Sequence, residues 1–198
     1  MATRSAPVPS NQSDNLDRDD PVDFLKDQLD ALHYDGVLLR DRYKLGDRRD
    51  RRVGGQGVVQ FATHATRLEQ KYAVKFFLDR STFEAERAQL VNPKLQGVMP
   101  VIEDIIGNED GAIMSLGLPL PPMIIIEKGE SLDEWQLRSK ADFAGSMYIM
   151  LHLVERVVDL HKAGVVHRDL KPGNVINYPA RNEWTLIDFG GAADIGAS

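Results

Sequence analysis

His-Arg-Asp-Leu-Lys-Pro-Gly-Asn at residues 167–174, followed by Asp-Phe-Gly at residues 188–190, is the stretch that most strongly determines the expected fold. One loop carries an acid, Asp169, a lysine, Lys171, and an amide, Asn174, and a second acid, Asp188, follows nineteen residues after the first. Carboxylate and amide oxygens are ligands for hard divalent cations, and a lysine neutralises phosphate charge. The combination suits chemistry on a metal-bound phosphate group.

The composition is that of an ordinary globular chain. Its 198 residues are 42% hydrophobic and 27% charged, which is enough for one large domain or two small lobes. The net charge of −6 argues against nucleic acid as a partner, because such proteins usually carry a basic excess. Arginines do cluster at residues 48–52, but aspartates are interleaved with them, so we expect a solvated turn there rather than a dedicated anion site.

The chain contains no cysteine, which excludes disulfides and thiolate zinc sites. This usage fits an intracellular protein, and we expect a cytoplasmic one, with a plastid or nuclear location left open. The longest apolar run, at residues 123–126, is far shorter than the ~20 residues that cross a bilayer. We therefore expect no membrane span.

The first forty residues divide into two parts. Residues 1–19 are polar and lack apolar periodicity, which predicts a disordered leader. Residues 20–39 begin with Asp20-Pro21, typical of an N-cap followed by proline at the first helical position. Apolar residues at spacings of three and four then predict a short amphipathic helix that packs on the domain: Val22, Leu25, Leu29 and Leu32.

From Val37 to Ile126, short β-branched and aromatic runs separated by turns predict strands. The clearest strands are expected at residues 58–62, 72–77, 98–106 and 123–126. Residues 81–90, between the second and third of these, predict a helix. Ser81 and Glu84 are spaced as a capping box at its start.

After Glu130 the pattern becomes helical. Six residues fall on one face of a helix over about residues 143–161: Phe143, Met147, Met150, Val154, Val157 and His161. Other positions of this helix, among them Ile149 and Leu160, are apolar too, so we expect burial on several sides. Gly164 is a natural left-handed cap, and residues 175–176 and 184–187 frame a hairpin.

Two further motifs precede the 167–174 loop: residues 53–62 read VGGQGVVQFA and residues 72–75 read YAVK. In this order, with HRDLKPGN and DFG, the four motifs make residues 40–198 similar to the first part of a eukaryotic-type serine/threonine protein kinase domain. The resemblance implies an α+β fold. Residues 40–127 would be an antiparallel five-stranded small lobe with one main helix, and residues 128–198 the hinge and the start of a mainly helical large lobe.

The resemblance implies that the glycine-rich stretch covers the phosphates of ATP, because a loop with little side chain lets backbone amides approach them. The residues implied are Gly54, Gly55, Gln56 and Gly57. Arg52 stands where the family has its first glycine, a departure from the pattern. Val59 would pack on the adenine, and Ala73 is a further nucleotide-binding position. Alone, such a glycine cluster is typical of an ordinary hairpin.

Lys75, in the YAVK strand, would contact the α- and β-phosphates by the same resemblance. It needs a carboxylate on the following helix. Glu86 is favoured over Glu84, since Phe83, Glu86 and Leu90 match the family helix in spacing. A lysine among apolar neighbours is otherwise typical of a surface residue that extends its amine to water.

Residues 123–133 resemble the fifth strand and hinge of the family. Ile126 would then be the gatekeeper, and backbone groups of Glu127 and of Gly129 or a neighbour would pair with the adenine edge. Either Ser131 or Asp133 would meet the ribose, and the sequence does not decide between them.

In the catalytic loop, the resemblance gives each polar residue a role. Asp169 would orient the hydroxyl of the substrate, Lys171 would neutralise charge on the transferred phosphoryl group, and Asn174 and Asp188 would hold Mg2+. His167 would support the loop by hydrogen bonds. Arg168 would meet a phosphate on the activation segment.

These roles imply an ATP- and Mg2+-dependent enzyme that phosphorylates serine or threonine of a protein substrate that the sequence does not identify. A catalytically impaired nucleotide-binding or regulatory module is the alternative, and a small-molecule phosphotransferase is disfavoured by Arg168 and Lys171. Only eight residues follow Gly190, so the family's activation segment and later helices are expected to be missing. Part of the 143–161 helix should then face water, and the truncated chain should be impaired in transfer.

Overall fold

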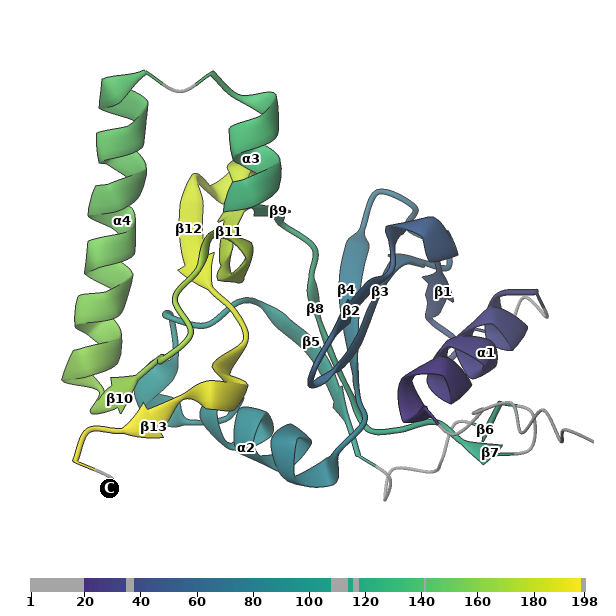
Figure 1. Cartoon of the computed structure of the whole chain (residues 1–198). Helices are drawn as coiled ribbons and strands as arrows, with labels where there is room; N and C mark the ends of the chain where they lie inside the picture. Colours follow the sequence, from purple (N-terminus) through teal and green to yellow (C-terminus); the bar gives the residue numbers. More distant parts are fainter. Residues whose placement is uncertain (1–19, 35–37, 108–113, 116–117, 141, 197–198) are drawn as a thin grey trace, which may run out of the picture.

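The computed structural model describes residues 20–34, 38–107, 114–115, 118–140 and 142–196 of the chain. It has a mixed α+β fold, with an antiparallel sheet on the right of the view in Figure 1 and a helical part with a smaller sheet on the left. The expected fold class is confirmed. The expected leader at residues 1–19 lies outside the described residues.

The larger sheet has the strand order β1-β3-β4-β8-β5, and β2 also pairs with β3. Its strands are β1 (Tyr43–Leu45), β2 (Arg52–Gly54), β3 (Gly57–His64), β4 (Lys71–Phe77), β5 (Ile102–Ile106) and β8 (Met123–Glu127). The first strand of the expected five is therefore split into β1 and β2, because the 3-10 turn η1 (Arg48–Asp50) interrupts it. The strand predicted from residue 98 begins only at Ile102, since η2 (Pro93–Leu95) and Pro100, which lacks a backbone N–H, precede it.

The register of this sheet decides which side chains share a face. Val59 of β3 lies opposite Lys75 of β4, and Lys75 lies opposite Ile124 of β8. Because strand side chains alternate between faces, these three residues lie on one face, and Val74 and its lateral neighbours lie on the other. The first face turns toward the rest of the molecule and forms one wall of a cavity.

Helix α1 (Pro21–Tyr34) covers the other face of the sheet, at the right edge of Figure 1. The carboxylate of Asp20 accepts a hydrogen bond from the backbone of Val22 at 2.8 Å, which confirms the predicted N-cap. Leu25, Leu29 and Leu32 are at most 2% exposed and pack in one cluster with the back of the sheet. The predicted apolar stripe is confirmed, and α1 packs as a layer on the larger sheet.

Helix α2 (Arg80–Leu90) lies below the sheet in Figure 1. Its N-cap is Asp79, whose carboxylate accepts from the backbone and hydroxyl of Thr82 at 2.8 and 2.7 Å and from the hydroxyl of Ser81 at 2.5 Å. The predicted capping box of Ser81 and Glu84 is therefore wrong, because a carboxylate one position before the helix takes the free N–H groups. These three hydrogen bonds hold the pKa of Asp79 far below its usual value.

The remaining elements follow the hinge. Helices α3 (Leu132–Arg138) and α4 (Phe143–Lys162) flank a three-stranded sheet in the order β12-β11-β9. Its strands are β9 (Glu130–Ser131), β11 (Val175–Tyr178) and β12 (Glu183–Leu186), while β10 (Val165–Val166) pairs with β13 (Ala193–Asp194). Two strands, β6 (Met114–Ser115) and β7 (Leu118–Pro119), form a separate hairpin. The hairpin predicted over residues 175–187 is confirmed, as is Gly164 as a left-handed residue with φ +83°.

The buried face of α4 differs from the predicted one. Phe143, Met147, Met150 and Val154 of the predicted stripe are between 51% and 80% exposed, whereas Ile149 and Leu160 are buried. Periodicity misled here because the helix is apolar on several sides, so tertiary contacts with β10 and β12 select the face. The expectation that part of this helix faces water is confirmed. None of the described helices combines the length and apolar character that a membrane span requires.

The arginine cluster at residues 48–52 is only partly the solvated turn that its charge pattern predicts. Arg48 and Arg49 are exposed, and Arg48 lies at 3.7 Å from Asp30. Arg51, in contrast, has a side chain only 8% exposed and forms an ion pair with Asp30 at 2.6 Å. The prediction is wrong for Arg51, because α1 approaches the turn from a distant part of the sequence.

Candidate active site

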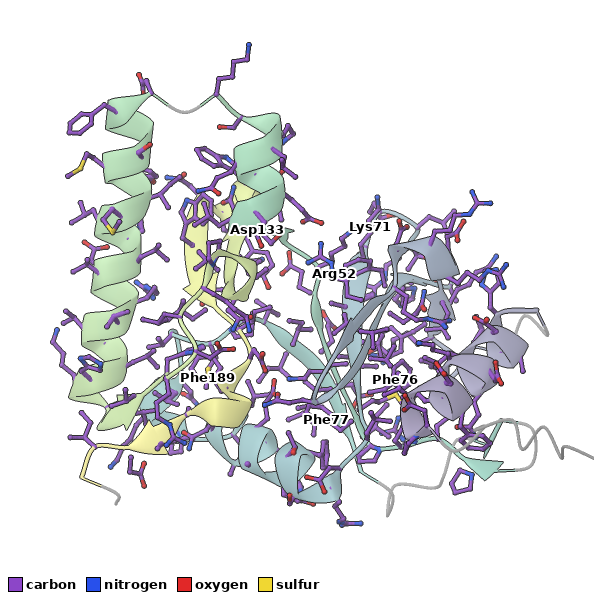
Figure 2. All side chains as sticks on the ribbon, viewed as in Figure 1. Arg52, Lys71, Phe76, Phe77, Asp133 and Phe189 are labelled. Carbon is purple, nitrogen blue, oxygen red and sulfur yellow. The ribbon has the colours of Figure 1, made fainter. Side chains whose placement is uncertain are left out.

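A cavity of about 220 Å3 lies between the larger sheet and the catalytic loop. Val59 and Ala73 line it from β3 and β4, while Ile176 of β11 and Ile187 line it from the other part of the chain. Figure 2 labels two of its lining residues, Arg52 of β2 and, below it, Phe189, together with Asp133 of α3. Apolar walls on both sides suit a flat heterocycle.

Lys75 lies at the centre of a charged cluster in this cavity. Its Nζ donates to Oε2 of Glu86 and to Oδ1 of Asp188, both at 2.6 Å, and to the side-chain oxygen of Gln56 at 3.3 Å. Glu86 is only 5% exposed, whereas the side chain of Glu84 is 41% exposed and pairs with Arg80 and Arg87. Glu86 is thus the partner of Lys75, as the spacing in the sequence favoured.

Helix α2 explains why this carboxylate can be buried. Phe83, Glu86 and Leu90 are its buried residues, and Phe83 packs against Phe77 at 5.5 Å between ring centroids. Burial raises the pKa of Glu86, an effect that the charge of Lys75 opposes and that of Asp188 increases. The buried ion pair therefore couples the position of α2 to that of Lys75.

Asp188 is held by the residues around it. Its backbone is left-handed, with φ 67°, and Phe189 beside it is buried against the ring of His167 at 4.9 Å. His167 Nε2 lies 2.9 Å from the carbonyl of Ile187, and its Nδ1 accepts from the backbone N–H of Asp169 at 3.3 Å. The predicted supporting role of His167 in hydrogen bonding is confirmed.

The catalytic loop forms a second charged cluster. Lys171 donates to Oδ2 of Asp169 at 2.6 Å, and the amide nitrogen of Asn174 donates to the same oxygen at 3.0 Å and to the Asp169 carbonyl at 2.9 Å. The hydrogen bond from Lys171 lowers the pKa of Asp169, and the hydrogen bond from Asn174 has a smaller effect in the same direction. The contact between Lys171 and Asp169 also raises the pKa of Lys171. Asp169 is therefore a carboxylate at neutral pH and able to accept a proton or a hydrogen bond.

Asn174 and Asp188 have donor atoms that fit Mg2+. Both residues line the same cavity, and because the amide nitrogen of Asn174 bonds to Asp169, its carbonyl oxygen is the group left for a cation. Asp188 uses one oxygen for Lys75, which leaves the other. Magnesium typically takes one or two protein oxygens together with phosphate and water. No cluster of three or more acidic, histidine or cysteine side chains suited to a metal occurs in the described part of the chain.

The glycine-rich hairpin joins β2 to β3, with Gly54 opposite Gly57. A Cβ on Gly57, at φ +156°, would lie 1.9 Å from the backbone oxygen of Phe76, so glycine is sterically required there. Gly54 and Gly55 have no atom within 4 Å of an added Cβ. Close packing therefore does not require glycine at these two positions.

The hinge residues are packed more tightly than the sequence indicates. The N–H of Glu127 donates to Val101 at 3.0 Å, and its carbonyl accepts from the hydroxyl of Tyr178 at 3.0 Å. Burial strongly raises the pKa of that hydroxyl. A Cβ on Gly129 would lie 2.2 Å from the side chain of Ile176. Both hinge positions thus have structural partners on β11 beside any role toward adenine.

The two candidates for ribose contact differ in their surroundings. Ser131 is 1% exposed. Its hydroxyl accepts a hydrogen bond from the backbone N–H of Glu134 at 3.3 Å, and the carboxylate of Glu134 accepts one from the backbone N–H of Ser131 at 3.0 Å. These two bonds form a capping box at the start of α3, so the Ser131 hydroxyl already has a partner within the protein. The carboxylate of Asp133 faces the catalytic loop at Gly173.

Several residues of the cavity were missed by sequence reasoning. Arg52 forms an ion pair with Glu134 of α3, and its guanidinium lies 5.5 Å from the ring of Phe61, which Lys128 approaches at 4.0 Å. The departure at Arg52 was a visible signal, but its partner is 82 residues away. Ile176 and Ile187 carry no signal beyond that of buried strand residues.

Comparisons with known proteins agree with this geometry. No family model matches the chain. It is 31% identical over 168 residues to the probable serine/threonine-protein kinase PknB of Bifidobacterium longum, which covers 78% of this chain and 23% of the relative. It is 30% identical over 175 residues to the serine/threonine-protein kinase PknA of Mycobacterium tuberculosis, covering 82% and 38%, and 27% identical over 143 residues to protein kinase gsk3 of Schizosaccharomyces pombe, covering 70% and 36%. The chain thus spans between 23% and 38% of the length of these relatives.

Proposed function

Because this chain belongs to the serine/threonine protein kinase family, we propose that it binds ATP with Mg2+ in the cavity and transfers the γ-phosphate to a serine or threonine of a protein. The observation that carries the proposal is that two charged clusters lie beside each other, because Asn174 of the second cluster lines the same cavity as all three residues of the first. One is Lys75 with Glu86 and Asp188, and the other is Asp169 with Lys171 and Asn174. These groups supply the cations, carboxylates and amide that phosphoryl transfer requires.

Binding would use the apolar walls first. Val59 and Ala73 on one side and Ile176 on the other would hold the adenine, and backbone groups of Glu127 and Gly129 would meet its edge. The glycine-rich hairpin, Gly54 to Gly57, would cover the phosphates with its N–H groups. Lys75 would contact the α- and β-phosphates while Glu86 keeps it in position.

Asn174 and Asp188 would hold Mg2+, which neutralises phosphate charge and orients the γ-phosphate. For this, Asp188 would exchange part of its contact with Lys75 for the cation. Asp169, a carboxylate at neutral pH, would accept a hydrogen bond from the substrate hydroxyl and orient it for in-line attack. Lys171 would leave Asp169 for the transferred phosphoryl group as its charge develops.

Binding and transfer can be measured separately. The first measurement is a calorimetric titration of ATP with Mg2+ into the wild type, Lys75→Met and Asp169→Asn. The second is transfer of radiolabel from γ-labelled ATP to a basic protein substrate, with Asp194→Asn, an exposed aspartate outside the cavity, as the control. We expect Lys75→Met to weaken binding, and Asp169→Asn to bind ATP but to transfer about 10²- to 10⁴-fold more slowly. Equal transfer by the wild type and Asp169→Asn would refute the proposed mechanism.

A nucleotide-binding module without transfer activity is the second candidate. One observation favours it: the groove beside the catalytic loop, lined by Met150, Val154 and Leu170, is open, and these side chains are more than half exposed. The loop that carries Asp169 therefore has little packing on the side of this groove. Phosphoryl transfer depends on the exact position of Asp169, which such a loop would hold less firmly. Tight ATP binding without detectable transfer by the wild type would support this candidate.

A further inference from the structure

A buried network behind the glycine-rich hairpin takes no part in the proposed function so far. Arg51 directly precedes β2, and its guanidinium donates to Asp30 of α1 at 2.6 Å and to the side-chain oxygen of Gln60 at 2.7 Å. A third contact joins it to the backbone carbonyl of Lys26 at 3.4 Å. Two of the three acceptors belong to α1, so this arginine fastens the helix to the start of the hairpin.

Gln60 extends the network to the connection that precedes β2. It is 1% exposed, and its amide nitrogen donates to the backbone carbonyls of Gly46 and Asp47, both at 3.1 Å. Gly46 and Asp47 lead into the turn that ends at Arg51. The network therefore fixes both ends of the connection between β1 and β2.

The position of Gln60 links this network to the cavity. Gln60 lies on β3 between Val59 and Phe61, which line the cavity from the opposite face of the strand. Strand β2 exposes all three of its residues and pairs with β3, so it has little packing of its own. The base of the hairpin is thus held from behind by α1.

We propose that α1 is a positioning element for the nucleotide, with Asp30 and Arg51 as positioning residues that hold the hairpin over the phosphates. This inference rests on the proposed ATP binding. Without the carboxylate of Asp30, the buried guanidinium loses its charged partner and moves toward solvent, and its bond to Gln60 goes with it. The adenine-binding wall is expected to persist, because Ala73 and Ile126 lie in the paired strands β4 and β8, away from this network.

The network therefore predicts a selective effect. Ligands with phosphates should depend on Asp30 and Arg51, whereas a ligand without phosphates should not. A role in stability alone would weaken both kinds of ligand in parallel or neither.

The test compares titrations of ATP with Mg2+ and of adenosine into the 198-residue chain. Asp30→Asn is the main variant, and Asp23→Asn is its matched control, since Asp23 is a 68% exposed carboxylate of the same helix that pairs with Lys26. Arg51→Lys is a milder second variant, because an ammonium keeps the charge toward Asp30 but not the planar fork that also reaches Gln60. If Asp30→Asn does not fold, Arg51→Lys is used in its place to test the inference.

We expect Asp30→Asn to bind ATP at least about 5-fold more weakly, and adenosine within about 2-fold of the wild type. Arg51→Lys should show the same selectivity with a smaller change, and Asp23→Asn no change. Unchanged ATP affinity in folded Asp30→Asn and Arg51→Lys, or a parallel loss of both ligands, would overturn the inference and leave the proposed function intact. Failure of the wild type to bind either ligand would overturn the proposed function and this inference together.

Discussion

Replacing Gly129 by alanine should separate the hinge from β11. An added Cβ would lie 2.2 Å from Cγ2 of Ile176, 2.6 Å from the backbone oxygen of Asn177 and 3.0 Å from the ring of Tyr178. Carbon atoms in contact prefer about 3.5–4.0 Å, so the hinge must move by more than 1 Å or its neighbours must give way. The Ile176 side chain lines the cavity, whereas the Asn177 carbonyl belongs to a strand paired on both sides and cannot shift without disturbing that sheet.

The expected cost follows from this overpacking. Forced insertion of a methyl group into a packed site costs about 2–3 kcal/mol. For a chain of this size that corresponds to a fall in Tm of roughly 4–12 °C. Because the hydroxyl of Tyr178 bonds to the carbonyl of Glu127 at 3.0 Å, displacement of the hinge should break this bond too.

The assay is thermal unfolding followed by circular dichroism, together with the ATP titration. Gly191→Ala is the matched control, since an added Cβ there meets its nearest backbone atom, the carbonyl of His167, at an ordinary 3.8 Å. We expect the control to melt close to the wild type. If Gly129→Ala has the same Tm as both, the close packing of the hinge on β11 is refuted.

Three further predictions concern the two lobes and the helix that carries Glu86. Glu86→Gln should lower the free energy of unfolding by about 1.5–3 kcal/mol and weaken ATP binding, whereas Glu84→Gln, on the exposed side of α2, should do neither in urea unfolding and titration. Arg52→Gly should change the free energy of unfolding by less than about 1 kcal/mol, because the ion pair of Arg52 with Glu134 of α3 is half exposed. It should nevertheless speed the release of a fluorescent nucleotide in stopped flow, because this pair joins the two sides of the cavity. An unchanged release rate would count against a role of Arg52 in closing the cavity. The folded-state pKa of Asp79 is depressed, so its contribution to stability is complete above about pH 5 and decreases as the pH falls through the unfolded pKa of about 3.9 toward the folded one. The difference in unfolding free energy between the wild type and Asp79→Ala should therefore narrow between pH 5 and pH 3, and a constant difference would contradict the role of Asp79 as N-cap.

The sequence predicted the parts of this structure that local chemistry specifies. The apolar stripe of α1 could be predicted because one face of that helix is apolar and the other polar. Glu86 was predicted as the partner of Lys75 because Phe83, Glu86 and Leu90 match the helix of the family in spacing, and these three are the buried residues of α2. The supporting hydrogen bonds of His167 followed from the resemblance of its loop.

What the sequence did not predict depends on contacts between distant segments. The face of α4 could not be chosen by periodicity, because Ile149 and Met150 are both apolar and packing alone decides which is buried. In the sequence, Arg51 looks like the other arginines of a surface turn. Only the ion pair with Asp30 of α1, a distant segment, distinguishes it from them. Ile176 lines the cavity together with Val59, and its proximity is decided by the topology of the chain, which local sequence does not reveal.

Two consecutive arginines thus hold the glycine-rich hairpin from opposite sides. Arg51 joins its base to α1 through a nearly buried pair, and Arg52 joins it to Glu134 of α3 through a half-exposed one. Exposed pairs contribute at most about 1 kcal/mol, while a buried arginine without its partner is costly. Opening of the cavity for nucleotide exchange should therefore break the Arg52 pair and leave the Arg51 pair intact. The hairpin would then move with α1 and the small lobe as one body, and the residue that replaces the family's first glycine would set how easily the two lobes part.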